Sequence, residues 1–329
     1  MPEINPTTEE AAPSLENGRT AQPNGLAESP PNQEEATYYT IIGSGTRQTV
    51  PLEMARTIEA YEKSIGMPVW LLLQRGEDEI DDSVVDLFWH KREELPSQSP
   101  VALLIHSIGG YAESAFRLAK LLRHRCGHFI AIVPRQAKSA ATLLALGGAE
   151  IILNDEAELG PLDAQIMDMD REEYSSALDE VQTLERLQAF ALDALDQTMM
   201  FLLARTGKKI ETILPHATMF VAELAKPMFE KIDVVHYTQR ARDIKVAEEY
   251  AIRLLRPRYS KDDAEQIARH LVEKYPEHGF VIDHDEPAHV EFKLQLKKPS
   301  SEQGSMLNLL VPFLGKQLVL GRIYKESAS

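Results

Sequence analysis

The stretch VPRQAKSAATLLALGG, residues 133–148, has the pattern of a buried strand followed by a short helix. The helix is expected to begin at Ser139, directly after Lys138, and to end at Gly147 and Gly148. A serine at this point is most often an N-cap that accepts a hydrogen bond from the helix backbone. A serine beside exposed backbone N–H groups is also the arrangement of a nucleophile, so the rest of the chain must distinguish the two interpretations.

On both sides of this stretch, short apolar runs alternate with segments of helical periodicity. The expected strands are residues 68–74, 100–107, 128–134 and 149–154, and the expected helices are residues 50–66, 81–95, 110–125 and 139–148. Strands that are apolar throughout are typical of a parallel sheet with helices on both faces. The pattern therefore predicts an α/β fold built from parallel strand–helix units.

The sequence changes character after residue 166. One long helix is predicted over residues 171–207 and further helices over about 216–274, so a helical insertion occupies about 171–274. Residues 278–294 have the pattern of a loop that leads into a strand. The apolar run 306–320 is interrupted by proline, glycine and lysine, and we expect it to be buried or to face a partner.

Three parts of the chain follow from this pattern. Residues 1–36 are rich in Pro, Glu, Asn, Ser and Thr, so they are predicted to be a disordered tail. Residues 37–300 are predicted to form one domain that includes the helical insertion. Residues 301–329 follow as a C-terminal extension.

Composition excludes several classes of protein. The 51 acidic and 35 basic residues give a net charge of -16, which argues against nucleic acid as a partner. The single cysteine, Cys126, excludes a disulfide within the chain and is expected to be buried and inert. The sequence shows no signal peptide and no apolar run of about 18 residues, so we expect a cytoplasmic location, and membrane association is left open but not predicted. No nucleotide-binding motif is present and no cofactor is expected.

Two predicted strand-to-helix turns carry residues suited to chemistry. Gly109 and Gly110 follow the strand 100–107, and glycines there allow a sharp turn that exposes backbone N–H groups. Ser139 starts the helix after the next strand, with the Ala140 N–H beside it. Because ligands bind beyond the carboxyl ends of parallel strands, we expect the two turns to lie together, as acyl transfer requires.

These residues carry a family resemblance. IHSIGGYAESAFRLAKLL (105–122) and AKSAATLLALGGAEIILNDEAELGPLDAQ (137–165) resemble the serine-peptidase branch of the Clp protease/crotonase superfamily. More narrowly, they are similar to the serine dehydrogenase proteinases, relatives of signal peptide peptidase A, and YPEHGFVIDHDEPAH (275–289) is similar to that family's closing motif. The resemblance spans about residues 65–295.

The resemblance implies a crotonase/Clp protease-like fold and a peptidase site. Ser139 would match the nucleophile, and Gly110 and Ala140 the two backbone donors that bind the oxyanion. It also implies a peptide or protein substrate and a homo-oligomer, because relatives form rings or layers.

The general base is the open question. No lysine or histidine occurs from Ala140 to Gly207, whereas relatives place their base within such a window. The candidates are Lys138, the Lys208–Lys209 pair, His216 and His278. Each has a structural alternative, since lysines at a helix end suit the helix dipole and histidines often lie in turns. The favoured arrangement is Ser139 with His278 as base, oriented by Asp163.

The predicted function is therefore that of an ATP-independent serine endopeptidase, a hydrolase. One alternative is a catalytically silent family member that acts as an oligomeric interaction module, which the missing base in the usual window supports. A second is crotonase-type chemistry on an acyl thioester, which would not need Ser139. His284 and His289 lie among acidic residues, but their spacing matches no metal motif, and we expect no metal site.

Overall fold

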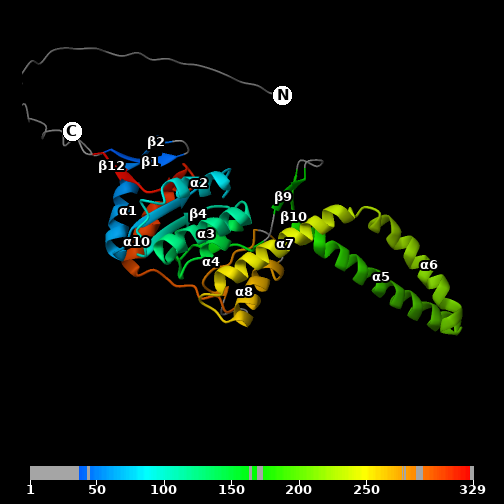
Figure 1. Ribbon diagram of the computed structural model, residues 1–329. Helices are drawn as coiled ribbons and strands as arrows, with labels where there is room; N and C mark the ends of the chain where they lie inside the picture. The colour runs from blue at the N-terminus through cyan, green and yellow to red at the C-terminus, as the bar shows by residue number, and fades with distance from the viewer. Residues whose placement is uncertain are drawn as a thin grey trace, which may run out of the picture. The chain divides into compact units, whose positions relative to one another are not determined.

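The structure is a computed structural model that describes residues 37–42, 45–162, 165–168, 173–275, 277, 279–286 and 292–326 (Figure 1). Residues 36–329 form one compact unit. The predicted tail, 1–36, and two of the predicted site residues, Asp163 and His278, lie outside the described residues.

The central sheet has five strands in the order β11-β3-β4-β5-β7. The parallel strands are β3 (Val69–Leu73), β4 (Val101–His106), β5 (Phe129–Val133) and β7 (Glu150–Leu153). Every residue of β3 and β4 is buried, because helices cover both faces of the sheet. The predicted α/β fold with a parallel sheet is confirmed.

Alternate residues of each strand face two separate helix layers. The helices of one layer are α2 (Asp82–His90), α3 (Ala112–Cys126) and α4 (Ala140–Leu146), and those of the other are α1 (Leu52–Ile65) and α10 (Ser301–Leu310) (Figure 1). Leu103 and Ile105 of β4 belong to the core under the first layer, whereas Ala102 and Leu104 belong to the core under the second. The helix predicted over 81–95 is too long, because α2 ends at His90 and residues 91–94 form turns.

The C-terminal segment completes the sheet. After α10 comes the 3-10 turn η1 (Val311–Phe313), and β11 (Val319–Gly321) then pairs antiparallel with β3. Leu307, Leu310 and Leu314 are buried in the same core as α1, so the run 306–320 is buried in part, whereas Leu309 in the same run is exposed. A second, antiparallel sheet is formed by β1 (Tyr38–Ile42), β2 (Thr46–Val50) and β12 (Tyr324–Lys325).

The predicted insertion begins with strands and continues with helices. The strands β9 (Gln165–Asp168) and β10 (Glu173–Ser176) pair antiparallel, so the helix predicted from residue 171 starts later. The helices are α5 (Ala177–Thr206), α6 (Ile210–Phe229), α7 (Val234–Leu255) and α8 (Lys261–Glu273). Helix α5 packs on α6 and α7, and α7 packs on α3, α4 and α8 (Figure 1). The helical insertion is thus anchored to the layer that covers the sheet.

Candidate active site

Ser139 has an unusual backbone at the junction between β6 (Gln136–Ala137) and α4. Its φ of 48° and ψ of -119° place it in a region that residues other than glycine rarely adopt. Its side chain makes no capping hydrogen bond to α4, so the N-cap interpretation is not supported. Strained backbone of this kind persists only where the surrounding structure holds it, and it is concentrated at functional sites.

The Gly109–Gly110 turn is fixed by residue Ile80, which lies far from it in sequence. The Ile80 N–H donates to the Gly109 carbonyl at 2.7 Å, and the Tyr111 N–H donates to the Ile80 carbonyl at 2.9 Å. Gly110 has a φ of 138°, and a Cβ added to it would lie 2.4 Å from the Ile80 nitrogen. Only glycine fits here, because both the backbone angle and the space exclude a side chain.

The two turns are in direct contact. A Cβ added to Gly109 would lie 2.8 Å from the Ser139 Cβ and 3.2 Å from the Ala140 nitrogen. The Lys138 N–H also donates to the Ser107 carbonyl at 3.0 Å. Glycine at residue 109 therefore allows the serine turn to approach, and the structure brings together the two turns that the sequence singled out.

Two backbone N–H groups at this contact differ from their neighbours in their hydrogen bonds within the described chain. The Gly109 N–H donates to the Ser107 hydroxyl at 3.0 Å, and the Ala141 N–H donates to the Lys138 carbonyl at 2.8 Å. The N–H groups of Gly110 and Ala140 make no hydrogen bond to another described residue. Ala140 is the first residue of α4, where the N–H has no partner within the helix. These two donors are suited to bind an oxyanion.

Lys138 is buried and its side chain points into the protein. Its ammonium lies 2.8 Å from a Glu158 carboxylate oxygen, 3.3 Å from the Leu159 carbonyl and 3.2 Å from the Phe280 carbonyl. The carboxylate and the two carbonyls use all three N–H donors of the ammonium and hold it in the protein interior. This arrangement argues against Lys138 as the general base.

The other candidate lysines and His216 belong to the α5–α6 hairpin. Lys208 and Lys209 are exposed in the turn after α5, and His216 is exposed on α6. Helix α5 has 30 residues and is therefore about 45 Å long, with this turn at its far end. Among the described residues, no contact connects Lys208, Lys209 or His216 with Ser139.

The pair Asp163 and His278 lies outside the described residues, so its role stays a prediction. The described chain beside each is informative. Leu159 and Ile282 exchange two backbone hydrogen bonds, of 2.9 and 3.1 Å. Ile282 forms only this isolated bridge, and the described residues 279–286 and 292–294 contain no strand, so the strand predicted there is wrong for that part.

Sequence reasoning missed the residues that support the glycine turn. Gln74 follows β3, and its amide Nε2 donates to the Glu79 carbonyl at 2.8 Å, next to Ile80. Arg75 and Asp78 form an ion pair of 2.8 Å within the same loop. These contacts hold Ile80 against Gly109 and Gly110. No local pattern in QRGEDEI, residues 74–80, signals them, because the partner turn is about 30 residues away.

The remaining candidates carry no assigned chemistry. His284 Nε2 lies 2.6 Å from the Leu153 carbonyl, and no three acidic, histidine or cysteine side chains of the described chain form a possible metal site. Cys126 is buried as predicted, and burial raises the pKa of its thiol to about 11. Among the described helices, none is long and apolar enough to cross a membrane.

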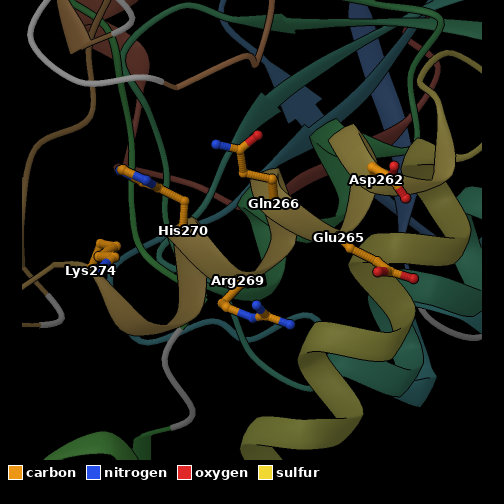
Figure 2. A pocket seen from close by; sticks show the side chains of 6 residues that line it. All are labelled: Asp262, Glu265, Gln266, Arg269, His270 and Lys274. Atoms are coloured by element: carbon orange, nitrogen blue, oxygen red, sulfur yellow. The ribbon is translucent and has the colours of Figure 1, made fainter.

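A shallow pocket of about 300 Å³ lies along α8 and contains none of the predicted site residues. Its lining side chains are Asp262, Glu265, Gln266, Arg269, His270 and Lys274. Figure 2 shows that they come from α8 and the residue after it and point in different directions. Groups that do not converge cannot act on one ligand, so this pocket is not assigned a function.

Comparison with known proteins identifies the family. A sequence model of the ClpP-like SDH-type serine proteinases matches residues 47–226, more than half of the chain. The chain belongs to this family. The matched residues include both turns described above, which agrees with the family resemblance seen in the sequence.

Individual relatives are more distant. One uncharacterized protein of Methanocaldococcus jannaschii is 25% identical over 235 residues, which cover 68% of this chain and 65% of that protein. A second is 39% identical over 71 residues, 22% of this chain and 25% of its own length. The chain thus spans less than two thirds of the length of either relative. A solved structure of a ClpP1 point mutant from Listeria monocytogenes matches 31% of this chain and 59% of its own, with 15% identity and a TM-score of 0.23.

Proposed function

We propose that the chain is an ATP-independent serine endopeptidase with Ser139 as nucleophile. The Ser139 hydroxyl oxygen attacks a peptide carbonyl carbon while the base accepts the hydroxyl proton. The oxyanion that forms is bound by the Gly110 and Ala140 N–H groups. The proton then passes to the departing amine, and water hydrolyses the acyl-enzyme in a second step.

The backbone of Ser139 is the observation that carries this proposal. A serine that served only as an N-cap would adopt ordinary extended backbone and accept a hydrogen bond from α4. Ser139 instead has a φ of 48° and lies against Gly109, next to two available N–H groups. Strain at a residue of this chemical type, at the carboxyl end of a parallel sheet, is expected of a nucleophile.

We assign the base to His278 and its orientation to Asp163. Leu159, four residues before Asp163, pairs with Ile282, four residues after His278. Lys138, the neighbour of Ser139, binds the carbonyls of Leu159 and Phe280. Described residues close in sequence to each of the three predicted residues therefore meet at Lys138.

The test is covalent labelling by a fluorophosphonate, with mass spectrometry of the adduct. We expect one adduct on Ser139 that is lost in Ser139→Ala and retained in Ser305→Ala, which removes an exposed serine on α10. His278→Ala and Asp163→Ala should slow the labelling. An intact protein that is not labelled between about pH 6 and pH 9 would contradict the proposal and favour the catalytically silent alternative.

We also propose that the chain forms a homo-oligomer through the α5–α6 hairpin. Of the 17 large apolar residues that are exposed in the described chain, 11 lie on this hairpin. They are Phe190, Leu192, Met200, Phe201, Ile210, Leu214, Met219, Phe220, Leu224, Met228 and Phe229. Their exposed area is on the order of 1,000 Å², about what one partner contributes to a stable dimer.

The shape and charge of the hairpin favour a second copy as its partner. An apolar groove of about 390 Å³ runs between α5 and α6, with Leu192, Val221 and Phe229 among its lining. Helix α6 also exposes apolar side chains on several sides, and a helix of this kind is normally buried. The charges between Glu185 and Glu230 are of both signs, so the hairpin lacks the basic face that would bind an anionic membrane.

Two measurements separate the remaining alternatives. Sedimentation equilibrium should give a mass above that of the 36.9 kDa chain, and a monomer at micromolar concentration would contradict the oligomer. Saturable binding of an acyl-CoA, without fluorophosphonate labelling, would instead favour acyl-thioester chemistry. The cytoplasmic location stays a prediction.

A further inference from the structure

Lys138 lies at the centre of a buried polar junction beside the candidate nucleophile. It is 8% exposed, and its three ammonium donors have three acceptors within 3.3 Å. The acceptors are the Glu158 carboxylate, the Leu159 carbonyl and the Phe280 carbonyl. Since an ammonium has three N–H groups, every donor is used and the buried charge is compensated by Glu158.

The acceptors belong to two segments that the sequence separates by about 120 residues. Glu158 and Leu159 form β8 (Glu158–Leu159), which pairs with β6 just before Ser139. Phe280 precedes Ile282, which pairs with Leu159 from the opposite side. The Lys138 side chain thus links Phe280 to β8. Because Lys138 directly precedes Ser139, its backbone links both segments to the candidate nucleophile.

The packing around Lys138 leaves little freedom for its side chain. A Cβ added to Gly160 would lie 2.6 Å from the Lys138 Cδ, so the aliphatic stem lies directly on the Gly160 backbone. Gly160 is held in turn by Thr142 of α4, whose hydroxyl accepts from the Gly160 N–H at 3.0 Å. The ammonium therefore has a fixed position relative to α4 and Ser139.

We propose that Lys138 is a positioning residue that sets the segment around residue 280 relative to Ser139. Its direct contact, Phe280, is two residues along the chain from His278, the proposed base. This inference rests on the proposed function, because a fixed base matters only if Ser139 acts as a nucleophile. Its effect would be on proton transfer and not on binding of a substrate.

Lys138→Met tests the inference, because methionine keeps most of the stem and removes the ammonium. The rate of fluorophosphonate labelling would be measured against probe concentration and pH, beside hydrogen exchange of peptides that cover residues 158–162 and 279–286. Lys297→Met is the matched control, since Lys297 forms an exposed pair with Glu150 at 2.7 Å. Glu158→Gln is a milder variant that keeps the shape of the junction if Lys138→Met does not fold.

We expect the maximal labelling rate of Lys138→Met to fall by about 10- to 100-fold at unchanged probe affinity. Its pH dependence should shift, and hydrogen exchange should rise in both segments. Glu158→Gln should change each quantity in the same direction by less, and Lys297→Met should behave as the wild type.

Each other outcome is decisive. If folded Lys138→Met or Glu158→Gln labels at the wild-type rate with the wild-type pH profile, Lys138 is only structural and the inference is overturned. If the wild type is not labelled, the proposed function fails, and with it the catalytic part of the inference. The exchange measurement then decides alone whether Lys138 fastens the segment at 280.

Discussion

The contact between the two turns and the α5–α6 hairpin make opposite use of their side chains. Around Gly109, Gly110 and Ser139, glycines remove side chains so that backbones can approach, and the neighbouring strands are fully buried. The hairpin does the reverse and exposes 11 large apolar residues. The first region is held by contacts within the chain, whereas the second has an exposed apolar surface of the kind that marks an interaction site. Substitutions in the first region should alter stability and chemistry, and those in the second should alter assembly.

The largest effect is expected at Gly110. In Gly110→Ala the new Cβ would meet the Ile80 backbone and force alanine into a backbone conformation with a φ of 138°. We expect a loss of about 4 kcal/mol in the free energy of unfolding, from combined strain and overpacking, together with loss of fluorophosphonate labelling. Urea denaturation measures the first quantity.

Gly76→Ala is the matched control for that substitution. A Cβ on Gly76 meets no atom within 4 Å. Its free energy of unfolding should therefore remain within about 1 kcal/mol of the wild type. Equal effects of the two substitutions would show that the Ile80 contact does not constrain the turn.

The next largest effect is expected from pH at the buried end of β4. Burial, with a smaller contribution from the charge of Arg135, lowers the pKa of His106 to about 4. As pH falls from about 6.5 to 4, the unfolded chain binds a proton that folded His106 does not, so folding loses about 3 kcal/mol. Above pH 6.5 both states are neutral and this contribution disappears.

Denaturation of His106→Leu at several pH values checks this. The wild type should lose about 3 kcal/mol more than the variant between pH 7 and pH 4. His216→Gln, which removes an exposed histidine of the hairpin, is measured beside it as the control. Parallel curves for wild type and His106→Leu would show that His106 takes up its proton normally in the folded state.

A smaller effect is expected on assembly. Phe220 is 58% exposed on α6, so Phe220→Ser should weaken self-association by about 1–3 kcal/mol without destabilising the subunit. Trp89→Ser is the control, because Trp89 is similarly exposed, at 51%, but lies on α2. Sedimentation over a range of concentrations gives the self-association constant of each variant. If Trp89→Ser weakens self-association more than Phe220→Ser does, the interface lies near α2 and not on the α5–α6 hairpin.

The smallest effect on stability is expected between two substitutions of Ser139. Glycine adopts a positive φ without strain, whereas alanine does not. Ser139→Gly should therefore be about 1 kcal/mol more stable than Ser139→Ala, although neither can be labelled. Thermal denaturation of the two variants compares them directly, and equal stability would indicate that the turn relaxes when the hydroxyl is removed.

Much of the fold could be predicted because its signals are local. An apolar run such as residues 100–107 indicates a buried strand, and an apolar pattern of helical period that ends at glycine indicates a helix. Their alternation along the chain implies a parallel sheet. The contact between Gly109 and Ser139 also followed, because carboxyl ends of parallel strands share one edge. The strand β11 did not follow, since VLG, residues 319–321, becomes a strand only through pairing with β3.

The candidate site was predictable in its residue types and not in its geometry. The sequence by itself determined that a serine and two glycines follow neighbouring strands. Only the tertiary structure decided that Ser139 has a positive φ, that Ile80 holds Gly110, and that Lys138 turns inward to join residues near 159 and 280. The physical reason is that these features depend on contacts between distant segments, whereas local sequence encodes only the preferences of each segment taken alone.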